Sequence, residues 1–261
     1  TSWVQLGEEL TGEAFGDLFG IAVSISANGH RLAVSKIPGT SSFPTSYVYI
    51  YEWNGDEWIQ LGNTLIGEPL EGYRHFGYSL SMDASGSRLA IGTRFYSDEE
   101  MEFNIGAAQV FEFDGIEWTQ IGQDIDGEAS SDQSGRDVSL SSDGTIIAVG
   151  ARGNNSPNGQ IYGHVRVYKN INGTWTQIGQ DIDGEGDIDA SGGFNSISSD
   201  GNIVAISARF NDGANGTDSG HVRIYENIND TWTQIGQDID GENMFDQSGI
   251  VSLSSDGRIA A

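Results

Sequence analysis

Hydrophobic and polar residues alternate in short runs along this chain, and the same order of runs recurs about every 57 residues. Each period begins with an alternating run such as Val138-Ser-Leu-Ser, followed by a mostly apolar run such as Ile146-Ile-Ala-Val. Alternation is typical of a strand with one buried face, and a continuous apolar run suits a strand buried on both faces. A third run, such as His164-Val-Arg-Val-Tyr, and a fourth run that starts at a tryptophan complete the period. The pattern therefore predicts four short strands per repeat.

Turn signals separate the first and second runs of each repeat. Asp143-Gly144 is typical, and Asp-Gly or Asn-Gly pairs tolerate the positive φ angles of a two-residue hairpin. We therefore expect two-residue hairpins that join antiparallel strands. The equivalent pairs are Asn28-Gly29, Ser85-Gly86, Asp200-Gly201 and Asp256-Gly257.

The fourth run carries a motif that recurs letter for letter. Trp-Thr-Gln-Ile-Gly-Gln-Asp-Ile-Asp-Gly-Glu occupies residues 118–128, 175–185 and 232–242, and looser copies begin at Trp3 and Trp58. A fixed period of this size marks a repeat architecture. Four short antiparallel strands per period describe one blade of a β-propeller, so we predict an all-β fold with four-stranded antiparallel blades. One tryptophan per blade is the natural wedge between neighbouring sheets.

The phase of the repeat predicts a single propeller, or a fragment of one, over residues 1–261. The chain opens on a fourth-type strand (3–10), runs through four full cycles, and ends at Ala261 inside the second strand of an incomplete fifth. An N-terminal strand beside the last cycle would close the ring, although a third-type strand would still be missing. Either a five-bladed ring closes imperfectly or these residues belong to a longer chain, and we favour the longer chain. The repeats start at Trp3, Trp58, Trp118, Trp175 and Trp232.

Composition limits the kinds of partner that this chain can bind. The chain has 38 acidic and 12 basic residues, for a net charge of -26. Such a surface repels nucleic acid and anionic membranes, and it either serves as a solubilising coat or binds cations. No apolar run approaches the length of a membrane span, so we expect no membrane insertion. The absence of cysteine excludes disulfides and thiolate metal sites.

Short motifs in the repeats resemble the FG-GAP repeats of integrin-α-like propellers. The matching residues are Phe19-Gly20, Phe76-Gly77, Gly150-Ala151, Gly106-Ala107 and Val110-Phe111. The tryptophan motif is also similar to repeats in long secreted surface proteins of marine bacteria and some algae. This resemblance implies an extracellular, cell-surface protein with a role in binding or adhesion.

The resemblance also implies calcium, but the family's site departs from its pattern here. Calcium-binding members carry an Asp-x-Asp-x-Asp-Gly loop between the first two strands, whereas this chain has turns such as Ser142-Asp143-Gly144. One carboxylate per turn falls far short of the six to eight oxygens that calcium takes.

Acidic residues gather instead before each first strand, in two columns of the repeat. One column is Glu13, Glu68, Glu128, Glu185 and Glu242, and the other is Asp17, Asp132, Asp189 and Asp246, with Arg74 in the second repeat. Repeated acids of this kind often cap turns by accepting backbone N–H groups. The densest stretch is the alternative site for a possible Ca²⁺ ion, because its side chains would lie on one face of an extended segment. Its acids are Asp181, Asp183, Glu185, Asp187 and Asp189.

Variable loops between the second and third strands should emerge on the same face as these acidic loops. Loops on a rigid scaffold often carry recognition, although length variation at exposed tips is an equally good explanation. The candidate ligand-binding residues are Phe43, Phe95, Tyr96, Asp98, Glu99, Glu100, Phe103, Arg152 and Arg209.

Nothing in the sequence predicts catalysis. Glycoside hydrolysis needs one unequal carboxylate pair, whereas these acids repeat identically. His164 and His221 occupy equivalent positions and are interpreted as structural. We therefore expect a non-catalytic propeller that binds a protein or glycan at the cell surface. The alternative is an architectural spacer or a subunit of a larger surface or secretion assembly, and a glycan-active enzyme is a remote third.

Overall fold

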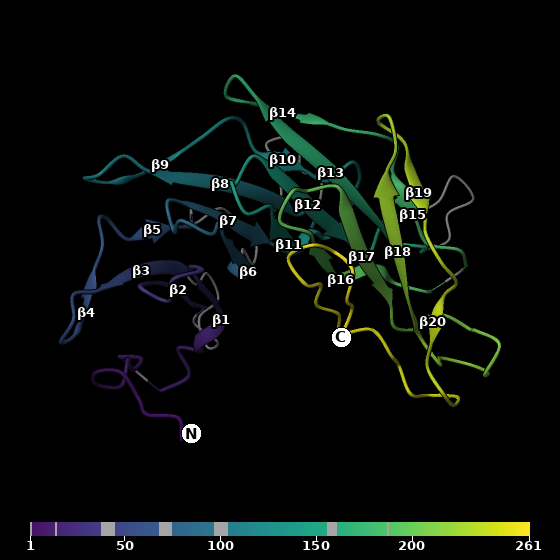
Figure 1. Cartoon of the computed structure of the whole chain (residues 1–261), viewed down its shortest axis with the longest axis horizontal. Helices are drawn as coiled ribbons and strands as arrows, with labels where there is room; N and C mark the ends of the chain where they lie inside the picture. The colour runs from purple at the N-terminus through teal and green to yellow at the C-terminus, as the bar shows by residue number, and fades with distance from the viewer. Residues whose placement is uncertain are drawn as a thin grey trace.

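The part of the chain that the structure describes is an all-β propeller with four antiparallel blades. The computed structural model describes residues 2–13, 15–37, 45–67, 75–96, 104–155, 161–186 and 188–261, and these residues form twenty strands. The strands make four separate sheets that follow one another in chain order (Figure 1). The predicted fold class is therefore confirmed. No helix among the described residues is long and apolar enough to cross a membrane.

Each blade contains three long strands and an outer strand in two pieces. Blade 1 consists of β1 (Phe19–Ile25), β2 (Arg31–Lys36), β3 (Tyr47–Trp53), β4 (Trp58–Gln60) and β5 (Leu65–Ile66). Blade 2 consists of β6 (Phe76–Met82), β7 (Arg88–Thr93), β8 (Ala107–Phe113), β9 (Trp118–Gln120) and β10 (Ile125–Asp126). Blade 3 consists of β11 (Ser134–Leu140), β12 (Ile146–Ala151), β13 (His164–Ile171), β14 (Thr174–Gln177) and β15 (Ile182–Asp183). Blade 4 consists of β16 (Ser191–Ile197), β17 (Ile203–Ala208), β18 (His221–Asn227), β19 (Trp232–Gln234) and β20 (Ile239–Asp240).

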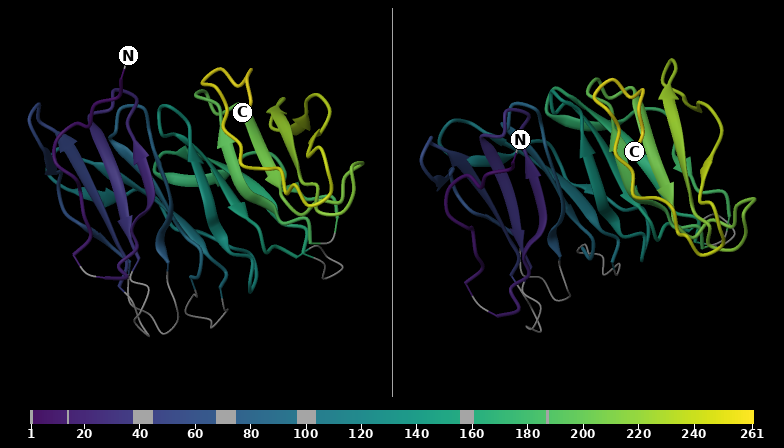
Figure 2. Two further views of the ribbon diagram at one scale, coloured as in Figure 1. Left: turned by 90° about the horizontal axis from the view of Figure 1, so that it is seen from below. Right: turned by 60° about the horizontal axis from the view of Figure 1, so that its bottom comes forward.

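The hydrophobic core lies between neighbouring blades. Figure 2 shows the sheets standing side by side, and apolar clusters fill the spaces between blades 1 and 2, 2 and 3, and 3 and 4. Val165 and Val167 of blade 3, for example, share a cluster with Val204 and Ile206 of blade 4. All six residues of β12 are buried, as its continuous apolar run predicts.

A glycine in the tryptophan motif splits the outer strand. In blade 2, β9 and β10 both pair with β8, and Gly122 between them has a φ of 77°. A Cβ atom at Gly122 would lie 2.7 Å from Cδ1 of Trp175 in the next blade. Glycine is therefore needed both for the backbone angle and for the close approach of the indole.

The tryptophans wedge between blades, as predicted, at three of the five repeats. Trp118, Trp175 and Trp232 are 2–3% exposed, and each indole donates a hydrogen bond to a backbone carbonyl of the preceding blade. The acceptors are Leu61, Ile121 and Ile178, at 2.9–3.1 Å. Trp3 is fully exposed and makes no such wedge.

The hairpins between first and second strands differ from the prediction. The Ser141 amide donates to the Ile146 carbonyl at 2.9 Å, so four residues separate the paired positions. Gly144 has a positive φ but Asp143 does not, whereas a two-residue type I′ turn needs both. The Asp143 carboxylate instead accepts the Ser141 hydroxyl and the Thr145 amide, at 2.7 and 2.9 Å. This side-chain cap stabilises a longer turn, and the two-residue expectation was wrong.

The two ends of the chain pack on different blades. The expected fourth-type strand at residues 3–10 is not formed, because no strand pairs with it. The Leu6 carbonyl accepts the Trp58 indole at 3.2 Å, which places this segment against blade 1 rather than beside the last cycle. At the other end, the Ser255 carbonyl accepts the Ser199 amide at 2.8 Å, so residues 250–261 lie beside blade 4.

Candidate functional site

A basic residue stands at the end of every second strand. Lys36 ends β2, and Arg94, Arg152 and Arg209 directly follow β7, β12 and β17. Equivalent positions of neighbouring blades lie at the same edge of the propeller, so these side chains gather on one face. Lys36 is neutralised by Glu13 and Asp17, at 2.9 and 3.2 Å, and these contacts raise its pKa.

Two of the arginines border a cavity of about 730 Å³ on the loop face. Arg94 and Arg152 line it together with Phe210, which follows β17. Its other walls come from the loops before β11 and β16 and from the loops after β12 and β17, which confirms that the two sets of loops share a face. Arg209 and Arg136 line a small adjoining cavity that Arg152 also borders. Arg136 comes from β11, where the equivalent residues of the other repeats are Ile21, Tyr78, Gly193 and Ile250.

Aromatic rings hold these guanidinium groups in place. The Arg94 guanidinium lies 4.3 Å from the ring centre of Phe95, and that of Arg152 lies 5.2 Å from Phe210. Arg94 and Arg136 both approach Tyr78, at 5.2 and 5.5 Å. Cation–π contacts of this kind fix a guanidinium without neutralising its charge.

The four arginines form no ion pair with a carboxylate within the part of the chain that the structure describes. Nε and Nη1 of Arg136 are buried and have no hydrogen-bond partner there. Burial, followed by the positive charges of Arg94 and Arg209, lowers the pKa of Arg152. Burial likewise lowers the pKa of Arg136, and the charges of Arg94 and Arg152 add to this effect. The cavity is therefore a region of concentrated positive charge in an acidic protein.

The cavity wall contains backbone in a rarely adopted conformation. Ser131, Gln133, Ile188 and Ala190 have φ angles of 75°, 55°, 69° and 57°. Such angles cost energy outside glycine and persist only where surrounding contacts impose them.

Aspartates of the acidic column cap the turns that contain these residues. The Asp132 carboxylate accepts the amides of Glu128 and Ala129, at 3.0 and 2.9 Å. Asp189 accepts the Gly186 amide at 2.6 Å. Asp17 and Asp246 accept the amides of Glu13 and Asn243 in the same way. The turn-capping interpretation of this column is confirmed.

The sequence-predicted ligand residues fall into three groups. Arg152 and Arg209 lie at the cavities, and Phe95 stacks on Arg94 beside them. The backbone carbonyl of Tyr96 accepts the Gly106 amide at 3.2 Å. Phe43, Asp98, Glu99, Glu100 and Phe103 lie outside the described residues.

The sequence interpretation missed Arg94 and Arg136. The column of basic residues after each second strand is a signal that points to Arg94. Arg136 has no counterpart in the other repeats, so no column reveals it.

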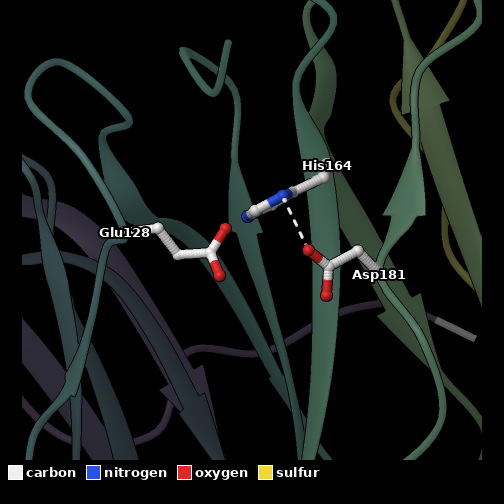
Figure 3. A group of neighbouring side chains, drawn as sticks. All are labelled: Glu128, His164 and Asp181. Atoms are coloured by element: carbon white, nitrogen blue, oxygen red, sulfur yellow. Dashed lines mark ion pairs between the residues drawn. The ribbon is translucent and has the colours of Figure 1, made fainter. Parts of the chain in front are cut away.

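Two further groups of side chains lie at the seams between blades. Figure 3 shows the first, in which His164 extends from β13 toward Glu128 and Asp181. Its Nδ1 lies 3.7 Å from Oδ2 of Asp181. Burial, followed by the charge of Arg166, lowers the pKa of His164 to about 4, so its ring is neutral at pH 7. The second group repeats these residue types one blade later, with Glu185, His221 and Asp238.

The acids proposed for calcium are distributed over these seams. Asp181 belongs to the first group and Glu185 to the second, while Asp189 caps a backbone amide. Burial and the nearby charge of Asp181 raise the pKa of Asp183. Asp187 lies outside the described residues, so a five-acid calcium site stays a prediction.

Comparison with known proteins supports the fold. The sequence matches no family model, and a search of curated proteins gives no match. The structure is similar to Sqt1 from Chaetomium thermophilum, with a TM-score of 0.51, 14% identity, and coverage of 81% of this chain and 43% of that chain. The periplasmic gluconolactonase PpgL of Pseudomonas aeruginosa gives 0.55 and 14%, over 92% of this chain and 63% of that chain. Hydrazine synthase from Kuenenia stuttgartiensis gives 0.54 and 11%, over 97% and 76%.

This chain thus spans less than two thirds of the first two proteins, and at 11–14% identity the likeness concerns the propeller fold alone.

Proposed function

We propose that this propeller is a non-catalytic binding module whose loop-face cavity recognises an anionic ligand. The ligand class is a glycan or protein that presents carboxylate or sulfate groups. The observation that carries this proposal is the convergence of Arg94, Arg136, Arg152 and Arg209 without a carboxylate partner among the described residues.

The charge distribution favours an anion in this cavity. The chain has only 12 basic residues and 38 acidic residues, yet two arginines line this cavity and two more line the small cavity that adjoins it at Arg152. Like charges held close together repel, and an anionic ligand would offset that repulsion. Arginine also offers planar pairs of N–H donors that match carboxylate, phosphate and sulfate oxygens.

The cavity also has the size and lining of a recognition site. Its volume of about 730 Å³ lies within the usual range for small-ligand pockets, about 300–1,000 Å³. Phe210 and Ile188 add apolar surface. Asp212 and Asp218 line the part formed by blade 4, so a bound ligand would meet acceptors as well as donors. The capped, strained wall places these groups in position before a ligand arrives.

We further propose that these are FG-GAP-like repeats and that the protein works outside the cell, at the cell surface. Both proposals rest on the sequence motifs and on the similarity of the tryptophan repeat to secreted surface proteins. Binding by the cavity distinguishes this function from that of an architectural spacer, whose contacts would cover the flat sides of the blades instead.

Calorimetric titration tests the proposal. The probes are a sulfated oligosaccharide, its desulfated counterpart and an oligoglutamate peptide, at physiological ionic strength. Arg152→Ala combined with Arg209→Ala should weaken binding at least tenfold, because each charged hydrogen bond contributes about 1.5–3 kcal/mol. Arg88→Ala is the matched control, since that guanidinium pairs with Glu112 at 2.9 Å.

Preference for the sulfated sugar would assign a glycan, and preference for the peptide would assign a protein. Equal affinity of the double variant and the control, or no binding of any probe, would refute the proposal.

A further inference from the structure

Two equivalent trios of possible metal ligands occupy consecutive seams of the propeller. In the trio of Glu128, His164 and Asp181, one ligand atom from each residue lies within 4.8 Å of the others. Glu185, His221 and Asp238 form the same arrangement. The glutamate follows the outer strand of one blade, while the histidine and aspartate belong to the next blade.

The histidines supply an independent sign of a missing ligand. His164 and His221 are each 1% exposed, and Nε2 of both has no hydrogen-bond partner among the residues that the structure describes. Burying a polar atom without a partner is costly, so nearly all buried polar atoms in proteins are paired. The same unpaired atom occurs at the same position of two blades. Figure 3 shows that the ring of His164 points into its group of carboxylates.

The geometry suits an ion better than a direct hydrogen bond. Nδ1 lies 3.7 Å from the aspartate oxygen in the first trio and 3.6 Å in the second, which is too long for a hydrogen bond. In each trio one ligand atom from every residue lies within 4.8 Å of the others, whereas two ligands on a tetrahedral zinc ion, each about 2.0–2.1 Å from the metal, are about 3.3 Å apart. A modest closure around an ion would therefore bring these atoms into place.

Neighbouring side chains already orient both carboxylates of the first trio. Arg166 holds Oε1 of Glu128 at 3.2 Å, and Gln177 donates to Oδ1 of Asp181 at 2.7 Å. These contacts leave the second oxygen of each carboxylate available to an ion. Outer partners of this kind fix ligands in known metal sites. Arg223 and Gln234 act in the same way on Glu185 and Asp238.

Solvent can reach the first trio. A cavity of about 500 Å³ is lined by Glu128, Asp181 and Asp183, together with Asn154 and Asn155. It provides an entry path, room for a water molecule as an additional ligand, and further acidic groups that attract a cation.

We propose that these trios are two equivalent binding sites for a divalent transition metal, of which Zn²⁺ fits best. One imidazole and two carboxylates suit zinc, whereas calcium takes oxygen ligands. Blades 1 and 2 carry Tyr47 and Ala107 at the histidine position, so they contain no equivalent site. Each ion would join two neighbouring blades.

Metal analysis of the chelator-stripped 261-residue protein, reloaded with ZnCl₂ and desalted, tests this proposal. We expect two ions per chain, one after His164→Ala and none after His164→Ala with His221→Ala. His30→Ala is the control and should retain two ions, because His30 is exposed and belongs to neither trio. Zinc should also raise the melting temperature in proportion to the sites that remain, by mass action.

A second pair of changes, Asp181→Asn with Asp238→Asn, keeps the side-chain shape and should also abolish binding if the histidine variants fail to fold. Zinc retention in both double variants, no zinc in the intact protein, or thermal protection by CaCl₂ but not by ZnCl₂ would overturn the proposal.

Discussion

Replacing Trp175 with alanine should weaken the packing between blades 2 and 3 and so lower the free energy of unfolding. The indole is 3% exposed and donates to the Ile121 carbonyl at 2.9 Å. Its ring packs directly on Gly122. The Gln123 side chain accepts a hydrogen bond from the Trp175 backbone amide at 3.1 Å and donates one to the Trp175 carbonyl at 2.7 Å. The substitution removes the ring and its hydrogen bond but leaves both backbone hydrogen bonds to Gln123 in place.

The expected loss in the free energy of unfolding is about 4 kcal/mol. Large-to-small replacement of a buried aromatic ring costs about 3–5 kcal/mol, because apolar contacts are lost and a cavity remains. The lost hydrogen bond accounts for about 1 kcal/mol of this, because the Ile121 carbonyl loses the indole N–H as its donor. Trp175→Phe should therefore cost clearly less than Trp175→Ala.

Urea denaturation followed by far-ultraviolet circular dichroism measures this loss without relying on tryptophan fluorescence. Trp3→Ala is the matched control, because Trp3 belongs to the same repeat column but is fully exposed. It should change stability by less than about 0.5 kcal/mol. Equal denaturation midpoints for Trp175→Ala and Trp3→Ala would show that the ring does not hold the blades together.

Two further predictions concern contacts between blades. Gln123→Ala should lower the free energy of unfolding by about 1–2 kcal/mol because it removes both hydrogen bonds to Trp175, whereas Gln5→Ala, on an exposed side chain, should have little effect in the same urea assay. Burial raises the pKa of Asp137 to about 7, although its carboxylate accepts the Asn195 amide at 2.6 Å. The folded state therefore holds a proton that the unfolded state releases near pH 4, so the stability from this group is present below pH 4 and is lost as the pH rises to about 7. The melting temperature of Asp137→Asn, relative to that of the native protein at the same pH, should therefore rise as the pH increases across this range, because His164, with its lowered pKa, changes stability in the opposite direction in both proteins.

Repetition made the fold predictable from the sequence. Five copies of a strand pattern fix the element order and the blade boundaries, and the letter-for-letter motif identifies the residues that join blades. The turn after Val138-Ser-Leu-Ser was harder to predict, because Asp143-Gly144 fits two turn types. A serine hydroxyl two residues before the aspartate decides between them. That hydroxyl acts through a side-chain contact, which a dipeptide rule does not include.

The candidate sites were less predictable because their residues meet through the fold. Glu128 lies 36 residues before His164, and Asp181 follows it by 17, so no local spacing marks them as a group. Arg136 reaches Arg152 only because β11 and β12 pair. Assigning each residue to its position in the blade would have placed His164 near Asp181, because the third strand of every blade pairs with the second piece of the outer strand, as β13 does with β15.

How many blades carry a residue helps to distinguish scaffold residues from residues of the candidate sites. Residues that recur in the repeats, such as Trp175 and Gly122, have their partners within the chain. The Trp175 indole donates to a carbonyl, and its ring packs against Gly122. Arg136, His164 and His221, which occur in only one or two blades, instead have buried polar atoms without a hydrogen-bond partner among the described residues, although Asp132 and Ser134, whose positions recur, also have such atoms. A scaffold contact must recur because every seam needs it, whereas a ligand contact needs only the blades that the ligand touches. Substitution of a fully repeated residue should therefore lower stability without a specific effect on ligands. Substitution of Arg136 or His164 should change binding of anions or zinc while the blades stay folded.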